Sequence, residues 1–263
     1  MQIHHAATAD DLADRLVSLW APRQPDPFAF DLAVVPAAGF QRWLSQRLAT
    51  ADGSSGICAG VEFVSAGQLL ARLGEADDPW RPRRLAHAVQ QVVLADDYPS
   101  DLGALRRHLD ASRETWTATG RIARHFAGYA RHLPQMLAAW ANGSDVGPDG
   151  EPLGDHAWHA VLYRSLVAHI GTDPITIRAA LLQRLADAPA EGVPHRVAVV
   201  NPQRIDPATL QVYEALSAHH QVDLLLLTHS PVRGDAGHPL NATLGVLATQ
   251  DAAILPGAAT PPA

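Results

Sequence analysis

Histidines that stand close together are the first residues of this chain that could do chemistry, because imidazole serves as an acid–base group and as a metal ligand. His156 and His159 lie three positions apart beside Asp155, and His125 and His132 share one face of a predicted helix. A zinc site uses three or four protein ligands, and the motifs HExxH and HxxEH are absent from the sequence. The spacing therefore favours surface or partly buried histidines, and we predict no metal-binding residue.

Lysine chemistry is excluded, because all 20 basic residues of the chain are arginines. A P-loop, a Schiff base and kinase-type phosphoryl transfer each require a lysine. Arginine does not replace lysine as a base, because its guanidinium does not deprotonate in proteins. The turn after the first predicted strand, His5–Asp10, also lacks glycine and leads into two carboxylates that repel phosphate. We therefore predict that this chain binds no ATP and no other cofactor.

Carboxylates and hydroxyls form no catalytic pattern either. Acidic residues are scattered, and a nuclease motif of the form D…ExK cannot occur without lysine. Ser54, Ser55 and Ser65 are not set in a GxSxG nucleophile elbow. We therefore predict that the chain has no catalytic residue of its own.

The composition combines enough apolar material for a core with a negative net charge. The chain has 263 residues, of which 47% are hydrophobic, and its formal net charge is −7. Proteins that bind nucleic acid without partner subunits are usually basic. Any DNA contact by this acidic chain therefore needs a local basic face. The single cysteine, Cys58, excludes internal disulfides and fits a reducing compartment. Neither a signal sequence nor a membrane-spanning run is present, so we expect a soluble cytoplasmic protein with no membrane partner.

Strand and helix patterns alternate in the first part of the chain. Short apolar runs bounded by turn residues predict strands at Gln2–Ala6, Leu32–Pro36 and Cys58–Val64. Apolar residues at helical spacing fill the intervals, and Thr8 and Ser65 are typical helix N-caps. This alternation predicts an α/β domain with a parallel sheet and right-handed crossovers.

Helical periods then dominate from Trp80 to Pro189, interrupted by Asn142–Asp155, which is predicted to be a flexible break. Strand signal returns at Arg196–Val200 and Val222–Thr228, on either side of a helix that Asp206 and Pro207 should begin. The predicted organisation has four parts: residues 1–78, the first part of the α/β domain; 79–190, an inserted helical subdomain; 191–230, the return to the sheet; and 231–263, a poorly structured tail.

The helix Arg121–Leu133 has the most informative surface of the helical block. Ile122, Phe126, Tyr129 and Leu133 should form its core face. A second arc of about 120° holds its basic residues, namely Arg121, Arg124, His125, Arg131 and His132. This face either contacts phosphate or is simply the solvated side of a buried helix, and the sequence leaves both readings open.

Several segments, in order, resemble one protein family over nearly the whole chain. They include LAVVPAAGFQRWLSQRLA after PDPF, then GICAGVEF, DDPW and AxxFxxYxxxxP, followed by HRVAVVNPQRIDPATLQVYEALSAHHQVDLLLLTHSP and HPLNATLG. This order resembles the N-terminal region of the gamma subunit of exodeoxyribonuclease V, the RecC family, and among its members is most similar to actinobacterial ones.

The resemblance implies the fold of an ATPase-dead superfamily-one helicase domain, whose large helical insertion corresponds to the helical block. It implies a DNA-guiding subunit of a helicase–nuclease complex that acts in double-strand break repair by homologous recombination. The partners would be the beta and alpha subunits, which use ATP and magnesium, together with DNA ends and single-stranded DNA.

The resemblance also implies where DNA would lie. In some members the turn after the second strand and a helix of the insertion line the channel that reads the Chi sequence. The matching positions here include Ala38, Arg42 and Arg124, and the side chains differ from those used for Chi. We therefore expect contact with the DNA backbone, through Ala38, Arg42, Arg121, Arg124 and Arg131.

Family members are several times longer than this chain, so we expect it to be a fragment or the product of a truncated or decayed gene. Such a piece alone should bind DNA and partners weakly. Two alternatives remain open: a remnant protein-interaction module without DNA binding, and an unrelated α/β enzyme with a helical cap.

Overall fold

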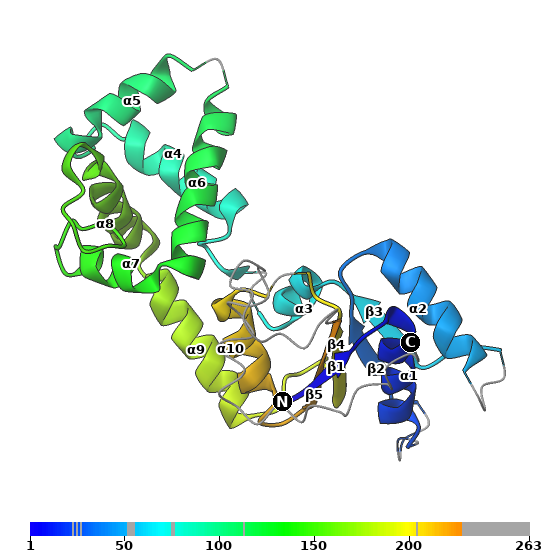
Figure 1. Cartoon of the computed structure of the whole chain (residues 1–263). Coiled ribbons are helices and arrows are strands. Elements are labelled where there is room, and N and C mark those ends of the chain that lie inside the picture. The colour runs from blue at the N-terminus through cyan, green and yellow to red at the C-terminus, as the bar shows by residue number, and fades with distance from the viewer. Residues whose placement is uncertain are drawn as a thin grey trace, which may run out of the picture. The chain divides into compact units, whose positions relative to one another are not determined.

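The computed structural model describes residues 1–22, 24, 26, 28–51, 56–74, 77–112, 114–203 and 205–227. The predicted C-terminal tail, 231–263, lies outside the described residues. The chain divides into two compact units. The sheet unit consists of Met1–Leu73 and the chain from Gln183 onward, and the helical unit is Gly74–Leu182 (Figure 1).

Five parallel strands form the sheet, which confirms the predicted α/β class. They are β1 (Gln2–Ala6), β2 (Asp31–Val34), β3 (Val61–Val64), β4 (Arg196–Val200) and β5 (Gln221–Leu227). Their spatial order is β1-β5-β4-β2-β3, so the strands that follow the helical unit lie between β1 and β2. β3 is shorter than the predicted Cys58–Val64, because Gly60, at φ +73°, interrupts the extended backbone.

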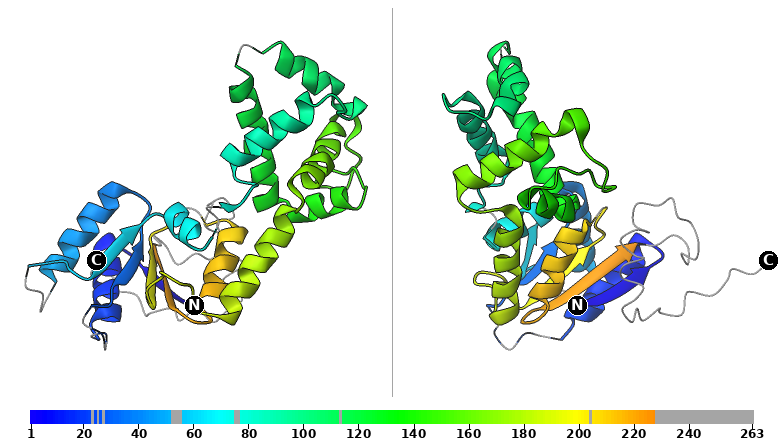
Figure 2. Two further views of the ribbon diagram at one scale, coloured as in Figure 1. Left: turned by 180° about the vertical axis from the view of Figure 1, so that it is seen from behind. Right: turned by 90° about the vertical axis from the view of Figure 1, so that its left-hand side faces the viewer.

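Helices cover both faces of this sheet (Figure 2). On one face lie α1 (Ala9–Trp20) and α2 (Ala38–Thr50). Their Leu12, Leu16 and Leu44 form a core with Val35, which follows β2, and with the strand residues Ala33, Ala198, Val200 and Leu225. On the other face lie α3 (Ala66–Arg72) and α10 (Pro207–Leu216). Both faces are buried, as a parallel sheet requires.

The predicted caps are present where these helices begin. Thr8 and Asp11 form a capping box on α1, and Ser65 and Gln68 form one on α3. The Asp206 carboxylate accepts a hydrogen bond from the Thr209 amide at the start of α10. Each side chain satisfies a backbone N–H that the helix itself leaves unpaired.

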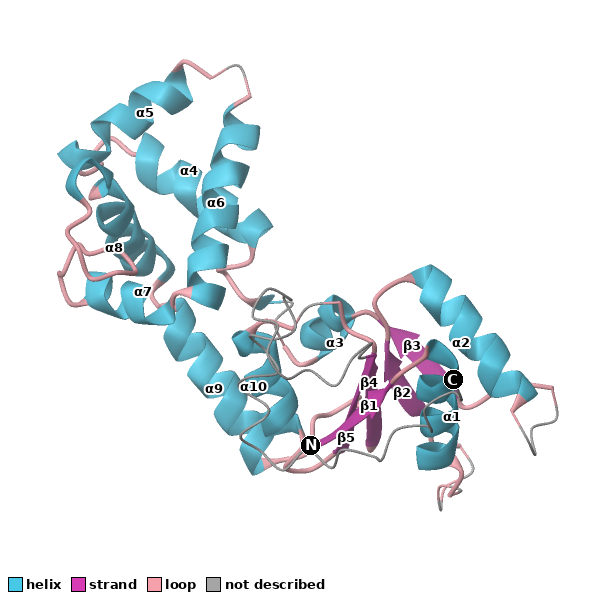
Figure 3. Cartoon of the chain, viewed as in Figure 1, coloured by secondary structure: helices cyan, strands magenta, loops and turns pink. Residues whose placement is uncertain are grey.

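The described part of the helical unit contains only helices, turns and one isolated bridge (Figure 3). Its helices are α4 (Pro82–Leu94), η2 (Ser100–Leu102), α5 (Gly103–Asp110), α6 (Thr115–His132), α7 (Pro134–Ala141), η3 (Gly154–His156) and α8 (Trp158–Ile170). α9 (Pro174–Asp187) crosses the division between the two units. No described helix is long and apolar enough to cross a membrane.

An aromatic cluster forms the centre of the helical unit. Phe126, Trp140 and Tyr163 are fully buried, and the ring of Trp140 lies edge-on to the other two. The predicted core face of α6 packs into this core, with Phe126 fully buried and Tyr129 partly buried. Ala123, which the prediction omitted, is also fully buried on this face.

Side chains of α7 and α8 form hydrogen bonds with the predicted flexible break, Asn142–Asp155. The Trp140 indole donates a hydrogen bond of 2.7 Å to the Val146 carbonyl. Arg164 donates to the Asp145 carboxylate at 2.6 Å and to the Trp140 carbonyl at 3.0 Å. Polar residues and glycines predicted mobility, whereas Asp145 connects the loop to α8.

Candidate nucleic-acid interface

The structure brings three of the five predicted DNA-binding residues together on α6. Arg121, Arg124 and Arg131 are all exposed and follow one side of the helix, opposite Ala123 and Phe126. Two exposed histidines, His125 and His132, complete this face. We call these five residues the basic face of α6.

The charge of the basic face is not neutralised at Arg121 and Arg124 by any carboxylate among the described residues. Other arginines of the chain have carboxylate partners, namely Arg47, Arg72, Arg84, Arg106, Arg164 and Arg196. A guanidinium without a carboxylate partner keeps its five donors available to phosphate oxygens.

The other two predicted residues, Ala38 and Arg42, lie in the sheet unit, so the five form two separate groups. Ala38 is the first residue of α2 and follows the carboxyl end of β2, and Arg42 is exposed one turn further on. The N-cap residue, Ala37, supplies no side-chain hydrogen bond, and the first turn carries no acidic residue. This helix start therefore has unpaired N–H groups and a partial positive charge.

The corresponding turn after β1 is closed to phosphate by the chain itself. The Asp11 carboxylate accepts a hydrogen bond from the Thr8 amide at 3.1 Å, and the Thr8 hydroxyl accepts one from the Asp11 amide. Asp10 forms an ion pair with Arg47 at 3.2 Å. An anion at this helix start would have to displace a carboxylate that already caps it.

A groove in the helical unit opens beside the basic face. It has a volume of about 400 Å³. Its wall comes from η2, α5, α6 and the start of α8, and the lining residues include Leu105, His108, Arg121, His125 and Trp158. Nothing in the sequence pattern indicated that α5 and α8 would meet this side of α6.

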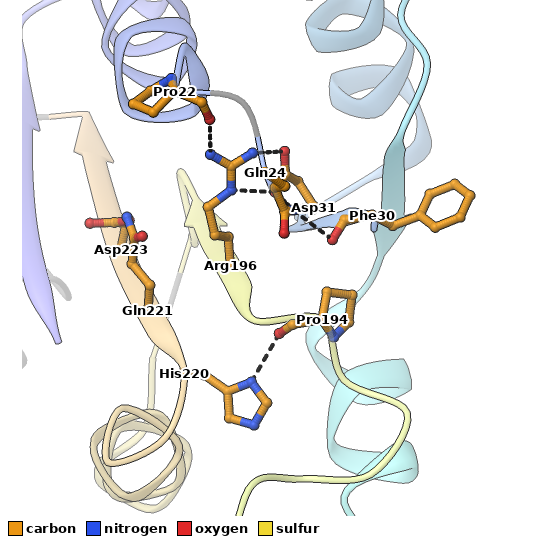
Figure 4. A network of polar contacts seen from close by, with 9 residues as sticks. All are labelled: Pro22, Gln24, Phe30, Asp31, Pro194, Arg196, His220, Gln221 and Asp223. Carbon is orange, nitrogen blue, oxygen red and sulfur yellow. Dashed lines mark hydrogen bonds and ion pairs between the residues drawn. The ribbon is translucent and has the colours of Figure 1, made fainter. Parts of the chain in front are cut away.

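Sequence reasoning also missed a buried ion pair at the amino ends of β2 and β4 (Figure 4). Arg196 donates two hydrogen bonds of 2.6 Å to the Asp31 carboxylate and one of 2.8 Å to the Pro22 carbonyl. Gln24 donates a further hydrogen bond to Asp31. The pair joins strands that are distant in the sequence, and no local pattern marks it.

A second buried polar group connects β1 to β5. The Nε2 atom of His4 lies 2.8 Å from the Asp223 carboxylate, and Arg15 donates to Nδ1 of the same ring at 3.3 Å. Because Nδ1 accepts a hydrogen bond from arginine, Nε2 carries the ring proton and donates a hydrogen bond to the Asp223 carboxylate. Burial raises the pKa of Asp223, but hydrogen bonds from His4 and Gln221 outweigh it, so this pKa lies below its usual value.

The paired histidines of the helical unit have packing roles in the structure. His159 stacks on Trp158 with ring centroids 3.7 Å apart, and its Nδ1 lies 2.9 Å from the His156 carbonyl. Burial lowers the pKa of His159 from its ordinary value. Over the described ranges, no group of three or more histidine, cysteine, aspartate or glutamate side chains is arranged to hold a metal ion.

Comparison with known proteins agrees with the resemblance seen in the sequence. A family model described as the N-terminal domain of RecC matches residues 1–238. The chain is 38% identical over 245 residues to the RecBCD enzyme subunit RecC of Mycobacterium tuberculosis, covering 86% of this chain and 22% of that protein. It is 34% identical over 277 residues to the RecC subunit of Mycolicibacterium smegmatis, covering 93% of this chain and 24% of that protein.

A more distant relative is the RecBCD enzyme subunit RecC of Escherichia coli, which is 26% identical over 245 residues and matches 86% of this chain and 21% of its own length. The chain thus spans between a fifth and a quarter of the length of the curated relatives it matches. Because the family model covers most of the sequence, the chain belongs to the RecC family, and it corresponds to the N-terminal domain.

Proposed function

We propose that this chain is part of a non-catalytic, DNA-guiding subunit of the exodeoxyribonuclease V helicase–nuclease, acting in double-strand break repair by recombination. The observation that carries the proposal is the basic face of α6, where Arg121 and Arg124 are exposed and have no carboxylate partner among the described residues. Guanidinium groups spaced along one helix side suit the phosphates of a single strand.

The closed turn after β1 supports a guiding role over an ATP-hydrolysing one. In a helicase-like domain this turn would hold the nucleotide phosphates, and here Asp11 occupies the helix start that phosphate would use. In the proposed complex the beta and alpha subunits supply ATP-driven movement and magnesium-dependent cleavage. The RecC relatives carry the name of the RecBCD enzyme, which supports these partners.

The test is single-stranded DNA binding by the chain, alone and mixed with the beta and alpha subunits, measured by fluorescence anisotropy at several salt concentrations. The test variant replaces Arg121, Arg124 and Arg131 with alanine. The matched control replaces Arg47, Arg72 and Arg84 with alanine. It removes the same charge, but each of these arginines has a carboxylate partner.

We expect the test variant to flatten the plot of log K against log salt by about 2 units, since each lost phosphate contact contributes about 0.7 on single strands. The control should change the slope much less. If the two triple variants changed the slope equally, the basic face would contribute only to the overall charge of the chain, which would contradict the proposal.

A protein-contact role is the second candidate, and an exposed apolar group favours it. Phe28 is 85% exposed, Phe30 55% and Ile57 67%. They precede the neighbouring strands β2 and β3, so the two loops lie at the amino edge of the sheet, away from Ala38. Size-exclusion chromatography with the beta subunit tests this role, and Phe28→Ser with Ile57→Ser should abolish co-elution if these loops are the contact.

A further inference from the structure

Three large apolar side chains of the sheet unit are exposed, and the DNA-guiding role gives them no task. Phe28 and Phe30 belong to the loop before β2, and Ile57 belongs to the segment before β3. The Asp31 amide donates a hydrogen bond of 2.8 Å to the Gly60 carbonyl, which joins the ends of the two segments. We call Phe28, Phe30 and Ile57 the apolar platform.

The loop that carries the two phenylalanines is anchored by its own polar groups. The Asp26 carboxylate accepts a hydrogen bond of 2.9 Å from the Phe28 amide. The Gln24 side chain donates to the Phe30 carbonyl at 3.2 Å and to the Asp31 carboxylate at 2.6 Å. The Phe30 ring points away from this network (Figure 4). An anchored loop loses little conformational freedom when a partner covers its side chains.

The edge of the sheet beside the apolar platform is β3. The carbonyls of Gly60 and Val64 accept hydrogen bonds of 2.8 Å from amides of the segment Asp31–Val35. Because peptide groups alternate in direction along a strand, those of Val61 and Phe63 face away from β2. Natural proteins cover or charge such an edge to prevent unwanted pairing. A partner seated on the apolar platform would therefore also cover this edge.

The residues around the apolar platform carry no charge. None of the described residues 28–30 and 56–60 is acidic or basic. Interfaces that form and dissociate are about as polar as the rest of a protein surface, whereas permanent ones are more apolar and exclude charge from their centre. The composition therefore favours a partner that stays in place.

The size of the apolar platform favours a partner in the same polypeptide. With exposed fractions of 85%, 55% and 67%, the three side chains present roughly 400 Å² of apolar surface. A stable complex of separate proteins buries about 800 Å² on each partner. Contacts between domains of one chain begin at about 600 Å² in total, or about 300 Å² on each side. A covalent link also keeps the partner at a high effective concentration.

The RecC relatives contain such a partner. The chain covers 22% of the Mycobacterium tuberculosis subunit and 24% of the Mycolicibacterium smegmatis subunit, so more than three quarters of each lies outside the match. The matching family model is the N-terminal domain, so this remainder follows it.

We propose that the apolar platform and the edge of β3 dock the remainder of a full-length RecC subunit, through an uncharged apolar surface of that remainder. The proposal rests on the protein-contact role given above as the second candidate function, and it names the partner. The beta subunit, the alpha subunit and a second copy of this chain are the other possible occupants, and the experiment distinguishes them.

The experiment places a photoreactive side chain on the apolar platform of a full-length subunit. Residues 1–238 of this chain replace the N-terminal domain of the Mycolicibacterium smegmatis subunit, and the chimera is purified with its beta and alpha subunits. p-Benzoylphenylalanine replaces Phe28, and mass spectrometry after irradiation identifies the crosslinked peptide. The matched control carries the same group in place of Trp116, an exposed aromatic residue of the helical unit. The isolated 263-residue chain carries the same two replacements to detect contact with a second copy.

We expect position 28 to crosslink to peptides of the same subunit that follow the N-terminal domain, and position 116 to give none of these peptides. The amides of Val61 and Phe63 should exchange hydrogen more slowly in the chimera than in the isolated chain, because the partner covers the edge. Ile57→Asp would bury a charge at the contact and should lower the yield of the position 28 crosslink about tenfold. In the isolated chain Ile57→Asp should leave the unfolding transition unchanged, because Ile57 is exposed there.

The outcomes separate this inference from the proposed functions. A crosslink from position 28 to the beta or alpha subunit would overturn the inference and leave a protein-contact role in place. A crosslink to a second copy, in the chimera or in the isolated chain, would overturn it in favour of self-association. Absence of any crosslink from position 28 in the chimera would contradict both the inference and the protein-contact role. None of these measurements involves DNA, so a loss of single-strand binding would refute only the DNA-guiding role.

Discussion

At the scale of single residues, the partner of an arginine decides what that arginine can do. Arg47 is held by Asp10 and Asp14 against α1, and Arg196 is buried against Asp31. By contrast, Arg121 projects from α6 without a carboxylate partner in the described ranges. The sequence shows the same residue type at all three positions. The difference between a structural arginine and a candidate phosphate ligand arises from what the fold places beside it.

The Asp31–Arg196 pair should be necessary for the stability of the sheet unit. Asp31→Asn removes the negative charge of the carboxylate that accepts two hydrogen bonds from the Arg196 guanidinium. It leaves Arg196 buried without a carboxylate partner. Loss of one partner of a buried pair costs about 3 to 5 kcal/mol, so chemical denaturation should show a fall of that order in the free energy of unfolding.

Glu62→Gln is the matched control for Asp31→Asn. Glu62 pairs with Arg72 near the surface, and both side chains are about a third exposed, at 39% and 33%. Exposed ion pairs contribute about 0 to 1 kcal/mol. The free energy of unfolding should therefore fall by less in the Glu62→Gln control than in Asp31→Asn. Similar losses for the two variants would show that Arg196 does not depend on Asp31.

At the scale of elements, α1, α2 and α3 each begin within a few residues of the carboxyl end of a strand, and their first turns differ. α1 is capped by Thr8 and Asp11, and α3 is capped by Ser65 and Gln68. α2 begins at Ala38 with no side-chain cap. Capping residues satisfy the amides that would otherwise bind an anion, so α2 is the start best suited to contact a phosphate.

The loop Asn142–Asp155 should owe its order to Arg164. Arg164→Ala removes the hydrogen bonds to the Asp145 carboxylate and the Trp140 carbonyl. We expect faster amide hydrogen exchange across this loop, with little change in α4 and α6, because the loop loses its side-chain link to α8 and keeps only its backbone hydrogen bonds and the Trp140 indole contact. The exposed Arg107 of α5 provides the control substitution. Unchanged exchange in Arg164→Ala would mean that the backbone hydrogen bonds of the loop hold it without the side chain.

At the scale of the whole molecule, the described residues include one hydrophobic core in the helical unit and another on the α1–α2 side of the sheet, and these two share no residue. The core of the helical unit is built from buried residues between Trp80 and Leu166. The α1–α2 side of the sheet is built from residues between Leu12 and Leu44 together with Ala198, Val200 and Leu225. Separate cores are what domains that can fold alone possess.

We therefore expect residues 77–182, expressed alone, to fold into a helical domain. Circular dichroism should show a helical spectrum and a cooperative thermal transition, because its buried aromatic cluster is complete within that segment. Phe126→Ala in the same fragment should lower the unfolding free energy by about 3 to 5 kcal/mol, the usual cost of removing a buried phenylalanine ring. A fragment that melts without cooperativity would show that the helical unit depends on the sheet unit.

Local patterns in the sequence were enough to predict where the strands, the helices and their caps occur. Thr8, Ser65 and Asp206 were recognisable because a cap acts on amides only two or three residues away. The exposed side of α6 was predictable for the same reason, since a helix repeats every 3.6 residues whatever surrounds it. Local patterns could not predict contacts from distant residues, such as the hydrogen bond that Arg164 donates to Asp145.

The sequence by itself therefore determined the α/β class, the helical insertion, the absence of lysine chemistry and the basic face of α6. Only the tertiary structure decided the strand order, the pairing of Asp31 with Arg196, and the groove in which Trp158 of α8 meets Arg121 of α6. The physical reason is the range of the interactions. Caps and helix faces depend on neighbours within a turn, whereas buried pairs and grooves form only when packing brings together residues far apart in the chain.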